Sequence, residues 1–287
     1  MSEEMIARRR FYAEEIQAVA NIKSDAVVEA LASVERERFL PPGPWAIRSE
    51  ADFMAPMRHT PDADPRHVCH NIAIGIDPAR MLFNGAPSVI ASAIDALTLA
   101  PGDRVLHIGT GLGYYTALMA QCVGPGGRVL GIEVDQDLAT GARVNLRDMD
   151  WVEVRHGDAS DSLAETFDAI LVNAGVTHPL PSWLDALSEH GRMIVPITAT
   201  FGPVSTIGKG PMLLVSVTPD RERFTVRPAG FVAIYSAFGV RNDTMNASIG
   251  QALSRMPFSP IKSLRRDAHD ADETCWAHSP DVCLSLT

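Results

Sequence analysis

A glycine-rich segment is the chemically most informative part of the chain. It reads Val105-Leu106-His107-Ile108-Gly109-Thr110-Gly111-Leu112-Gly113-Tyr114-Tyr115, an apolar run that leads into a G-x-G-x-G turn and then into a helical pattern. Glycines let such a turn bend tightly and approach a ligand without a Cβ atom in the way, and the start of the helix offers free N–H groups. The segment therefore predicts a site for a nucleotide-like ligand.

Polar side chains follow the next three apolar runs. Glu133 lies 20 residues after Gly113, where a carboxylate can accept hydrogen bonds from both hydroxyls of a ribose. Asp158 can meet an adenine amino group, and Asn173 ends a run at the edge where open α/β sheets bind ligands. Each is also compatible with an ordinary turn or a solvated loop. The residues expected at the cofactor are His107, Gly109, Thr110, Gly111, Gly113, Tyr114, Glu133, Val134, Asp158, Ala159 and Asn173.

Two cofactors share this kind of turn. The nicotinamide dinucleotide pattern G-x-G-x-x-G requires a glycine at position 114, where this chain has Tyr114. The difference favours S-adenosylmethionine, with S-adenosylhomocysteine as its product, and leaves a dehydrogenase as the rival interpretation.

Alternating strand and helix patterns surround the glycine segment and predict a parallel sheet covered on both faces. A helix with proline at its first position begins at Pro87. Beyond Gly208 a hairpin of 212–217 and 224–226, a strand 231–238 and a helix 243–255 are expected. The other expected strands are 104–108, 128–132, 152–155, 168–173 and 192–197, with helices at 114–122, 136–147 and 180–188.

The N-terminal part differs in pattern. Helices are expected over 3–22 and 24–35, the second with Ser24 as its N-cap, and six prolines in 41–70 predict a loop without regular structure. We therefore expect N-terminal helices and a substrate-side loop in 1–86, a cofactor-binding domain in 87–240, and an extension in 241–287 that packs on that domain.

Composition excludes some partners. With 25 basic and 35 acidic residues the net charge is −10, which argues against nucleic acid as a substrate, and no run of 18 apolar residues predicts a membrane span. The chain opens without a signal-peptide pattern, so a cytoplasmic protein with reduced thiols is expected. Cys275, His278 and Cys283 match no common zinc spacing, so no metal site is expected. The sequence leaves the oligomeric state open.

Several segments together resemble the protein-L-isoaspartate O-methyltransferase family, over roughly residues 25–240. The glycine motif His107–Tyr114 is shared by many methyltransferases, and the flanking matches indicate this family. They are Val34-Glu35-Arg36-Glu37-Arg38-Phe39-Leu40-Pro41, Asn84-Gly85-Ala86-Pro87, Gly191-Arg192-Met193-Ile194-Val195-Pro196 and Phe231-Val232-Ala233-Ile234.

The resemblance implies a Rossmann-like class I methyltransferase fold, with a mainly parallel seven-stranded sheet and helices on both faces. It also implies methyl esterification of the carboxyl group exposed in isoaspartyl peptides, so the partner would be a carboxylate of a peptide, protein or small molecule. Two positions depart from the family. Gly85 stands where the family carries a serine or threonine hydroxyl, and His107 stands where its glycine motif has an acidic residue.

The methyl acceptor decides how much catalytic help is needed. A carboxylate is ionised at pH 7, so alignment and exclusion of water suffice, whereas an amine or alcohol needs a base such as His70, Asp77 or His178. Arg80 could pair with a substrate carboxylate. Asn84 and Ser88 could supply the polar group that is missing at Gly85, or could cap the helix at Pro87. The catalytic candidates are Asn84, Ser88, Arg80 and His70.

Two alternatives stay open beside the carboxylate methyltransferase. Gly85 is compatible with a divergent methyltransferase that acts on another small molecule or a modified peptide. A protein that binds the cofactor without catalysis, and acts through its N-terminal helices and tail, is the third possibility.

Overall fold

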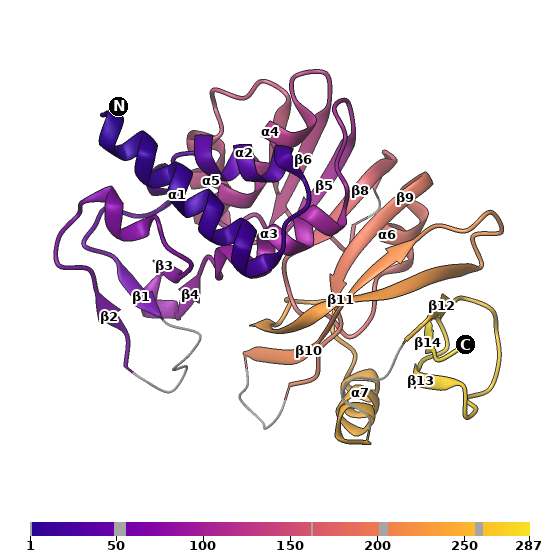
Figure 1. The fold of residues 1–287 in the computed structure, drawn as a ribbon. Helices are drawn as coiled ribbons and strands as arrows, with labels where there is room; N and C mark the ends of the chain where they lie inside the picture. Colours follow the sequence, from indigo (N-terminus) through magenta and orange to yellow (C-terminus); the bar gives the residue numbers. More distant parts are fainter. Residues whose placement is uncertain (1, 49–55, 162, 201–205, 256–260) are drawn as a thin grey trace. The chain divides into compact units, whose positions relative to one another are not determined.

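The computed structural model describes residues 2–48, 56–161, 163–200, 206–255 and 261–287 (Figure 1). Its internal contacts define two compact units, one formed by Met1–Gly102 and Thr110–Gly157 and the other by Asp103–Gly109 and Asp158–Thr287. The glycine segment thus contributes to both units. The division into 1–86, 87–240 and 241–287 stays a prediction.

Helices make up much of the first unit. The predicted N-terminal pair is confirmed, and the Ser24 hydroxyl accepts a hydrogen bond from the Val27 N–H, as expected of an N-cap. The helix with Pro87 at its first position is also confirmed. The α-helices of this unit are α1 (Glu3–Ala20), α2 (Asp25–Ser33), α3 (Pro87–Ala96), α4 (Tyr114–Val123) and α5 (Gln136–Asn145).

A small antiparallel sheet with strand order β2-β1-β3-β4 corrects one expectation for the first unit. The expectation of a loop without regular structure in 41–70 is wrong for the part that the structure describes, and residues 49–55 lie outside it. Two-residue and three-residue strands fit between prolines, which cannot donate to a sheet. The elements are β1 (Ala46–Arg48), β2 (Arg58–His59), β3 (Ala73–Asp77) and β4 (Leu82–Phe83), with 3-10 helices η1 (Arg36–Phe39), η2 (Pro65–Val68) and η3 (Pro78–Arg80).

Two parallel strands complete the first unit. β6 (Arg128–Glu133) pairs with β7 (Val152–His156), and α5 lies between them in the chain. Both strands begin where the sequence predicts and extend one residue further. Because β6 is buried over Val129–Glu133, its last residue is withdrawn from bulk water.

The second unit contains a mixed sheet. β5 (Arg104–Ile108), β8 (Phe167–Val172) and β9 (Leu187–Pro196) are parallel, while β10 (Ile207–Ser216) and β11 (Arg223–Tyr235) continue in antiparallel fashion. The expected strands are present, five in this unit and the parallel pair β6 and β7 in the first, and the Rossmann-like α/β architecture is confirmed. The separate strands expected at 224–226 and 231–238 are one strand, β11, whose pairing with β10 shifts register at Met212/Leu213.

In the second unit α6 (Pro181–Asp185) ends earlier than the sequence predicts, and β9 and β10 each begin five residues earlier. Helix α6 is a single turn rather than a helix to residue 188, because β9 already begins at Leu187. Helix α7 (Asp243–Arg255) matches its prediction. None of the helices in the described ranges is long and apolar enough to cross a membrane.

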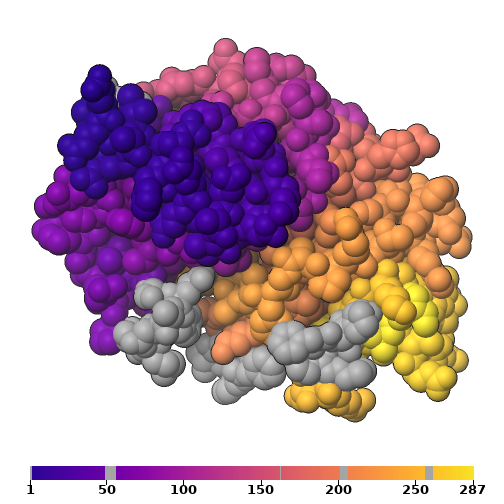
Figure 2. Space-filling view, viewed as in Figure 1, coloured from indigo at the N-terminus to yellow at the C-terminus, as the bar shows by residue number. Residues whose placement is uncertain are grey.

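Three unpredicted strands follow α7. β12 (Ser263–Arg265), β13 (Cys275–His278) and β14 (Cys283–Ser285) extend the sheet from β11 in the order β11-β12-β14-β13. Trp276 and Leu284 are buried there. These C-terminal residues (yellow) are visible at the surface in Figure 2.

Candidate cofactor and substrate site

The glycines of the cofactor loop are required by its backbone. Gly109, Gly111 and Gly113 have φ angles of 82°, 54° and 95°, which side-chain-bearing residues rarely adopt. A Cβ atom at Gly109 would lie 3.2 Å from the Asn173 carbonyl oxygen, and one at Gly113 would lie 2.8 Å from Leu146 Cδ1. The predicted loop is therefore built for tight turning as well as for close approach.

Glu133 anchors this loop within the first unit. Its carboxylate accepts hydrogen bonds from the Gly111 N–H at 2.7 Å and the Asp135 N–H at 3.1 Å. Burial raises the pKa of Glu133, and these two backbone donors oppose that rise. A buried carboxylate that already organises the glycine turn is suited to receive the hydroxyls of a ribose. Val134, the next residue, is 48% exposed and offers an apolar surface beside it.

The predicted cofactor residues of the second unit make hydrogen bonds with nearby backbone or side-chain groups. Asn173 donates through its side-chain amide to the Gly109 carbonyl at 3.3 Å, which fixes the end of β8 against the end of β5. Asp158 Oδ1 accepts from the Ser160 N–H at 2.9 Å, and the Ala159 carbonyl accepts from the Trp183 indole at 2.7 Å. Asn173 thus meets the glycine segment directly, while Asp158 and Ala159 organise the turn after β7.

The side chains of His107 and Tyr114 are buried. Burial lowers the pKa of His107 to about 3, so this imidazole on β5 is neutral in the folded protein. The Tyr114 hydroxyl lies 3.1 Å from that of Tyr12, and its ring packs on Phe39. We expected both residues at the cofactor. The Tyr114 side chain packs into the core of the first unit, and the place of both residues at the cofactor stays a prediction. Thr110, also expected there, is 4% exposed.

Arg36 organises the segment that precedes the cofactor fold. Its guanidinium is buried and donates to the carbonyls of Val68, His70 and Ile72 at 3.1, 3.0 and 2.8 Å. It also donates to Asn84 Oδ1 at 3.1 Å. One side chain therefore fixes the whole stretch from η2 to β4.

The sequence left open whether Asn84 and Ser88 supply a polar group near Gly85 or cap the helix at Pro87. In the structure Asn71, not Asn84, caps that helix. Asn84 Oδ1 accepts from Arg36 and from the Ile74 N–H at 3.2 Å, so Asn84 does not cap α3. The Asn71 side chain accepts from the Ser88 N–H at 3.0 Å instead. Ser88 lies in the first turn of α3, and its backbone is the capped group.

Arg80 is held by two carboxylates. Its guanidinium donates to Asp77 at 2.6 Å and also bonds Asp135, the residue that caps α5. Because both carboxylates already neutralise it, Arg80 is poorly placed to pair with a substrate. The contact instead ties the β3–β4 connection to the loop that follows Glu133, and a Cβ atom on Gly111 would lie 3.4 Å from Ile76 Cδ1. The end of β3 therefore lies against the cofactor loop, and Arg80 after it against the loop that follows Glu133, both within the first unit.

Two of the three candidate bases are engaged by neighbouring side chains. Asp77 caps η3 and pairs with Arg80, and this hydrogen bond lowers its pKa. His178 Nδ1 lies 2.9 Å from the Thr177 hydroxyl, and burial lowers its pKa. His70 lines a shallow hollow with Phe11 of α1.

Gly85 has a backbone conformation that a serine or threonine rarely adopts. Its φ is +72°, and its carbonyl accepts from the Tyr115 hydroxyl at 3.3 Å. A Cβ atom there would meet only Ile90, at 3.6 Å, so backbone strain rather than space disfavours a serine.

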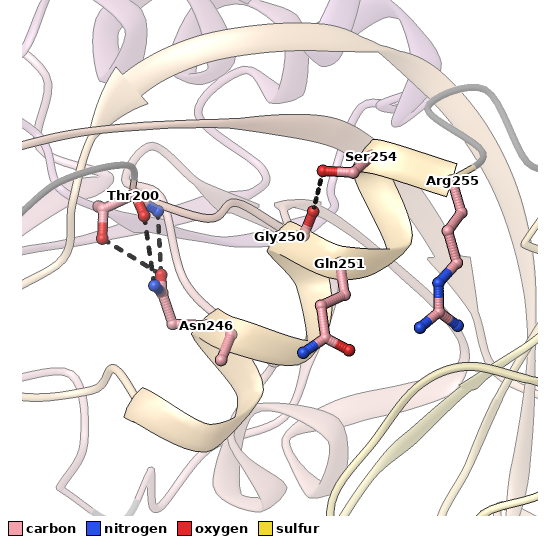
Figure 3. Close-up of a pocket in the computed structure, with 7 residues that line it drawn as sticks. Thr200, Asn246, Gly250, Gln251, Ser254 and Arg255 are labelled. Atoms are coloured by element: carbon pink, nitrogen blue, oxygen red, sulfur yellow. Dashed lines mark hydrogen bonds between the residues drawn. The ribbon is translucent and has the colours of Figure 1, made fainter.

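A separate hollow lies on α7 in the second unit (Figure 3). Asn246 faces Thr200 there and accepts from its N–H at 2.9 Å. Farther along α7, Gln251 and Arg255 line the same hollow. None of the predicted cofactor residues lines it, so we do not assign the cofactor to this hollow.

Sequence reasoning missed Arg36, Asn71 and Asp135 as organising residues. Asp135 carried a usable signal, because an aspartate just before a helical pattern is a good N-cap. Arg36 and Asn71 carried none, since their partners are 17 to 48 residues away in the chain.

Comparisons with known proteins agree with this geometry. Residues 59–211 match the model of the family described as protein-L-isoaspartate(D-aspartate) O-methyltransferase (PCMT). The protein-L-isoaspartate O-methyltransferase of Aeropyrum pernix is 31% identical over 238 residues, which is 80% of this chain and 80% of that protein. That of Methylorubrum extorquens is 34% identical over 233 residues, 78% of this chain and 87% of that protein.

Solved structures share the fold. A protein-L-isoaspartate O-methyltransferase structure aligns with a TM-score of 0.61 at 21% identity, covering 84% of this chain and 69% of that chain. A protein from Plasmodium falciparum in complex with S-adenosyl-L-homocysteine aligns with a TM-score of 0.53 at 18% identity, covering 81% and 97%. The family match and the two relatives confirm the class of enzyme and its cofactor that the glycine segment predicted. The chain belongs to the protein-L-isoaspartate(D-aspartate) O-methyltransferase family of S-adenosylmethionine-dependent enzymes.

Proposed function

We propose that the chain transfers the methyl group of S-adenosylmethionine to a carboxylate of a peptide, a protein or a peptide-derived molecule. A carboxylate with a pKa of about 4 is ionised at neutral pH and needs no base. The engagement of Asp77 with Arg80 and of His178 with Thr177 fits such a substrate better than an amine or an alcohol. Catalysis would then depend on alignment of the two reactants and on exclusion of water.

The amide of Asn84 carries this proposal. Its Nδ2 atom is buried and has no hydrogen-bond partner among the described residues. The side-chain orientation is fixed, because the other amide atom accepts from both Arg36 and the Ile74 N–H and must be oxygen. A buried N–H group without a partner costs about 1–3 kcal/mol. A carboxylate oxygen of the substrate would satisfy it, next to Gly85 where the family hydroxyl is missing.

An isoaspartyl peptide is the first acceptor to test, since the relatives are named for that activity. Gly85 supports a second candidate, a different small molecule or modified peptide, because it has no side-chain hydroxyl and because its positive φ is one that serine and threonine rarely adopt. A cofactor-binding protein without catalysis would bind S-adenosylhomocysteine and methylate neither class of acceptor.

The test is transfer of labelled methyl groups to an isoaspartyl peptide, read as base-labile radioactivity. Asn84→Asp keeps the oxygen that accepts from Arg36 but replaces the N–H donor by a second carboxylate oxygen. We expect methyl transfer to fall at least about 10-fold, from loss of one hydrogen bond to a charged group, with S-adenosylhomocysteine affinity unchanged.

Asn242→Asp is the matched control, because Asn242 caps the start of α7 through its side-chain oxygen and an aspartate does the same. Equal transfer by wild type and Asn84→Asp would contradict the role of Asn84. If wild type binds cofactor but leaves the peptide unlabelled, a screen of other carboxylates decides between the second candidate and a protein without catalysis.

We also propose that the protein acts in the cytosol. The four cysteines, all among the described residues, form no disulfide, which suits a reducing compartment. We further propose that the substrate is recognised without nucleic acid, as the net charge of −10 favours.

A further inference from the structure

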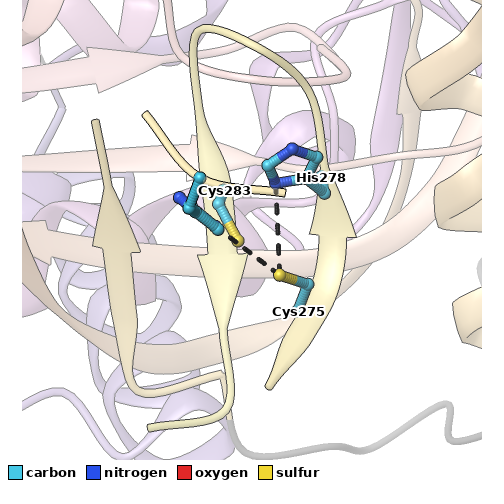
Figure 4. Close-up of side chains that lie close together, drawn as sticks. Cys275, His278 and Cys283 are labelled. Atoms are coloured by element: carbon cyan, nitrogen blue, oxygen red, sulfur yellow. Dashed lines mark hydrogen bonds between the residues drawn. The ribbon is translucent and has the colours of Figure 1, made fainter. Parts of the chain in front are cut away.

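Four potential metal ligands meet in the C-terminal strands of the second unit. They are His269, which precedes β13, Cys275 and His278 of β13, and Cys283 of β14, and their ligand atoms all lie within 4.8 Å of one another. Cys275, His278 and Cys283 point toward one another across the hairpin in Figure 4. The hairpin register places His278 directly opposite Cys283. Two sulfurs and two imidazole nitrogens thus converge on one point.

The distances are close to those of a tetrahedral site. Cys275 Sγ lies 3.6 Å from His269 Nε2 and 4.0 Å from His278 Nδ1. With Zn–S bonds of about 2.3 Å and Zn–N bonds of about 2.0–2.1 Å, the ligand atoms of a tetrahedral zinc site are separated by about 3.3–3.8 Å. The ligand atoms all lie within 4.8 Å of one another, so side-chain adjustments of up to about 1 Å would bring the two sets into agreement.

The surroundings of His269 fix the nitrogen that faces the cluster. Its Nδ1 lies 2.8 Å from the Asp267 carbonyl oxygen, to which it donates, so Nε2 is left as the nitrogen with a free lone pair. Asp267 is held in turn by Arg265, whose guanidinium donates to both of its carboxylate oxygens at 2.9 and 2.6 Å. A metal-ligating histidine that donates its other N–H to a carbonyl is the usual outer arrangement of zinc sites.

We propose that His269, Cys275, His278 and Cys283 bind one Zn²⁺ ion that stabilises the C-terminal strands. All four positions of the tetrahedron are protein ligands, which is typical of a structural rather than a catalytic zinc. Two thiolates neutralise the two positive charges of the ion, so the site can be partly buried without a net charge. The pair of soft sulfurs with two imidazoles favours zinc over magnesium or calcium.

The proposal also explains how the end of the chain can be ordered. β12, β13 and β14 have only three or four residues each, and residues 266–274 between β12 and β13 form no regular element. Strands this short contribute few ladder hydrogen bonds. A zinc ion would join the connecting segment, through His269, to both strands of the hairpin, and its binding energy would add to folding.

Two rival arrangements use the same atoms. Cys275 Sγ lies 3.5 Å from Asp272 Oδ1, so the cluster could be a set of hydrogen-bonded thiols without metal. The two cysteines could also oxidise to a disulfide. Neither rival would hold zinc, so metal content distinguishes the proposal from both.

The first test uses the wild-type full chain, expressed with zinc in the medium and purified under reducing conditions. Elemental analysis should give about one zinc per chain. Replacement by Co²⁺ should give the visible bands of a tetrahedral ion together with thiolate charge-transfer bands. Folded, reduced protein that holds less than about a tenth of an equivalent of zinc after zinc titration would overturn the proposal.

Variants identify the ligands. Cys283→Ser and His269→Gln should each lose most of the zinc, whereas Cys122→Ala, at a buried cysteine of α4, should keep it. Retention of a full equivalent by Cys283→Ser would contradict the assignment. If a variant fails to fold, alkylation of the wild-type protein still tests the site.

Removal of zinc by a chelator should expose Cys275 and Cys283 to iodoacetamide and leave the labelling of Cys69 and Cys122 unchanged. Equal labelling of all four with and without chelator would also refute the site.

Discussion

At the scale of single residues, Glu133 is the residue on which cofactor binding should depend most. It is buried, yet it accepts two backbone N–H donors, from Gly111 and Asp135. Glu133→Gln leaves one acceptor oxygen and sets an NH2 group against one of those donors. Hydrogen bonds to charged groups contribute about 1.5–3 kcal/mol, so we expect S-adenosylhomocysteine affinity to fall about 10-fold to 100-fold by calorimetry.

Glu153→Gln is the matched control for that measurement. Glu153 lies on the neighbouring strand β7 and pairs with Arg128 and Arg155 at the surface, where ion pairs contribute about 0–1 kcal/mol. The affinity of the Glu153→Gln variant for S-adenosylhomocysteine should equal that of wild type. Equal losses in both variants would mean that carboxylates act on the ligand through net charge rather than through the geometry of the loop.

Single residues also show which parts of the site the sequence could predict. Gly109, Gly111 and Glu133 were identifiable because their roles depend on neighbours in the chain or on the end of a strand. Arg36 and the amide of Asn84 were not, because Arg36 reaches acceptors 32 to 48 residues away and only the fold brings them together. The four ligands of the proposed zinc site show the same limit, since their spacing matches no common template and the first of them lies outside any strand.

At the scale of elements, Arg36 is the link between η1 and the segment from η2 to β4. Arg36→Lys keeps the charge but concentrates its donors at one point, so it cannot reach all four acceptors of the guanidinium. Loss of two hydrogen bonds of a charged group, at about 1.5–3 kcal/mol each, should lower the free energy of unfolding by about 3–6 kcal/mol. Because the oxygen of Asn84 would be left with one donor instead of two, methyl transfer should fall more than cofactor affinity.

Chemical denaturation and transfer assays check this prediction, with Arg38→Lys as the control. Arg38 is two residues away, is exposed and pairs with Asp148 at the surface, so its replacement should change neither quantity. A destabilised Arg36→Lys protein with normal transfer would show that the segment is structural and does not position the acceptor.

Elements differed in how well the sequence predicted them. β5, β6 and β8 are apolar runs buried on both faces, and each was placed within one residue. β2 and β4 have two residues each, and β12 and β14 three, which is too short for a period of two to be visible. The early end of α6 was missed because the Leu187 strand begins before the helical pattern fades.

At the scale of the whole molecule, the fold class followed from alternation along the chain, whereas the two compact units did not. The boundary between the units passes through the glycine segment itself, between Gly109 and Thr110. No composition change marks that position, because the units are defined by which residues pack together in space. The expected division into 1–86, 87–240 and 241–287 rested on the order of strands and helices along the chain, and it stays a prediction.

Global stability should depend on pH through His107, a histidine that folding keeps neutral. Burial lowers its pKa to about 3, whereas the unfolded chain binds a proton near pH 6.5. The unfolded state therefore binds more protons below pH 6.5, so stability is fully present above that pH and is lost as the pH falls toward 3. The limiting slope is about 1.4 kcal/mol per pH unit, which gives about 2 kcal/mol between pH 8 and pH 5. Urea denaturation at several pH values gives the free energy of unfolding as a function of pH. Wild type should lose about 2 kcal/mol between pH 8 and pH 5 that His107→Leu does not lose, whatever the difference in stability between the two proteins at pH 8. The exposed His190→Gln should follow wild type, and parallel curves for wild type and His107→Leu would show that His107 is not the group that folding keeps neutral.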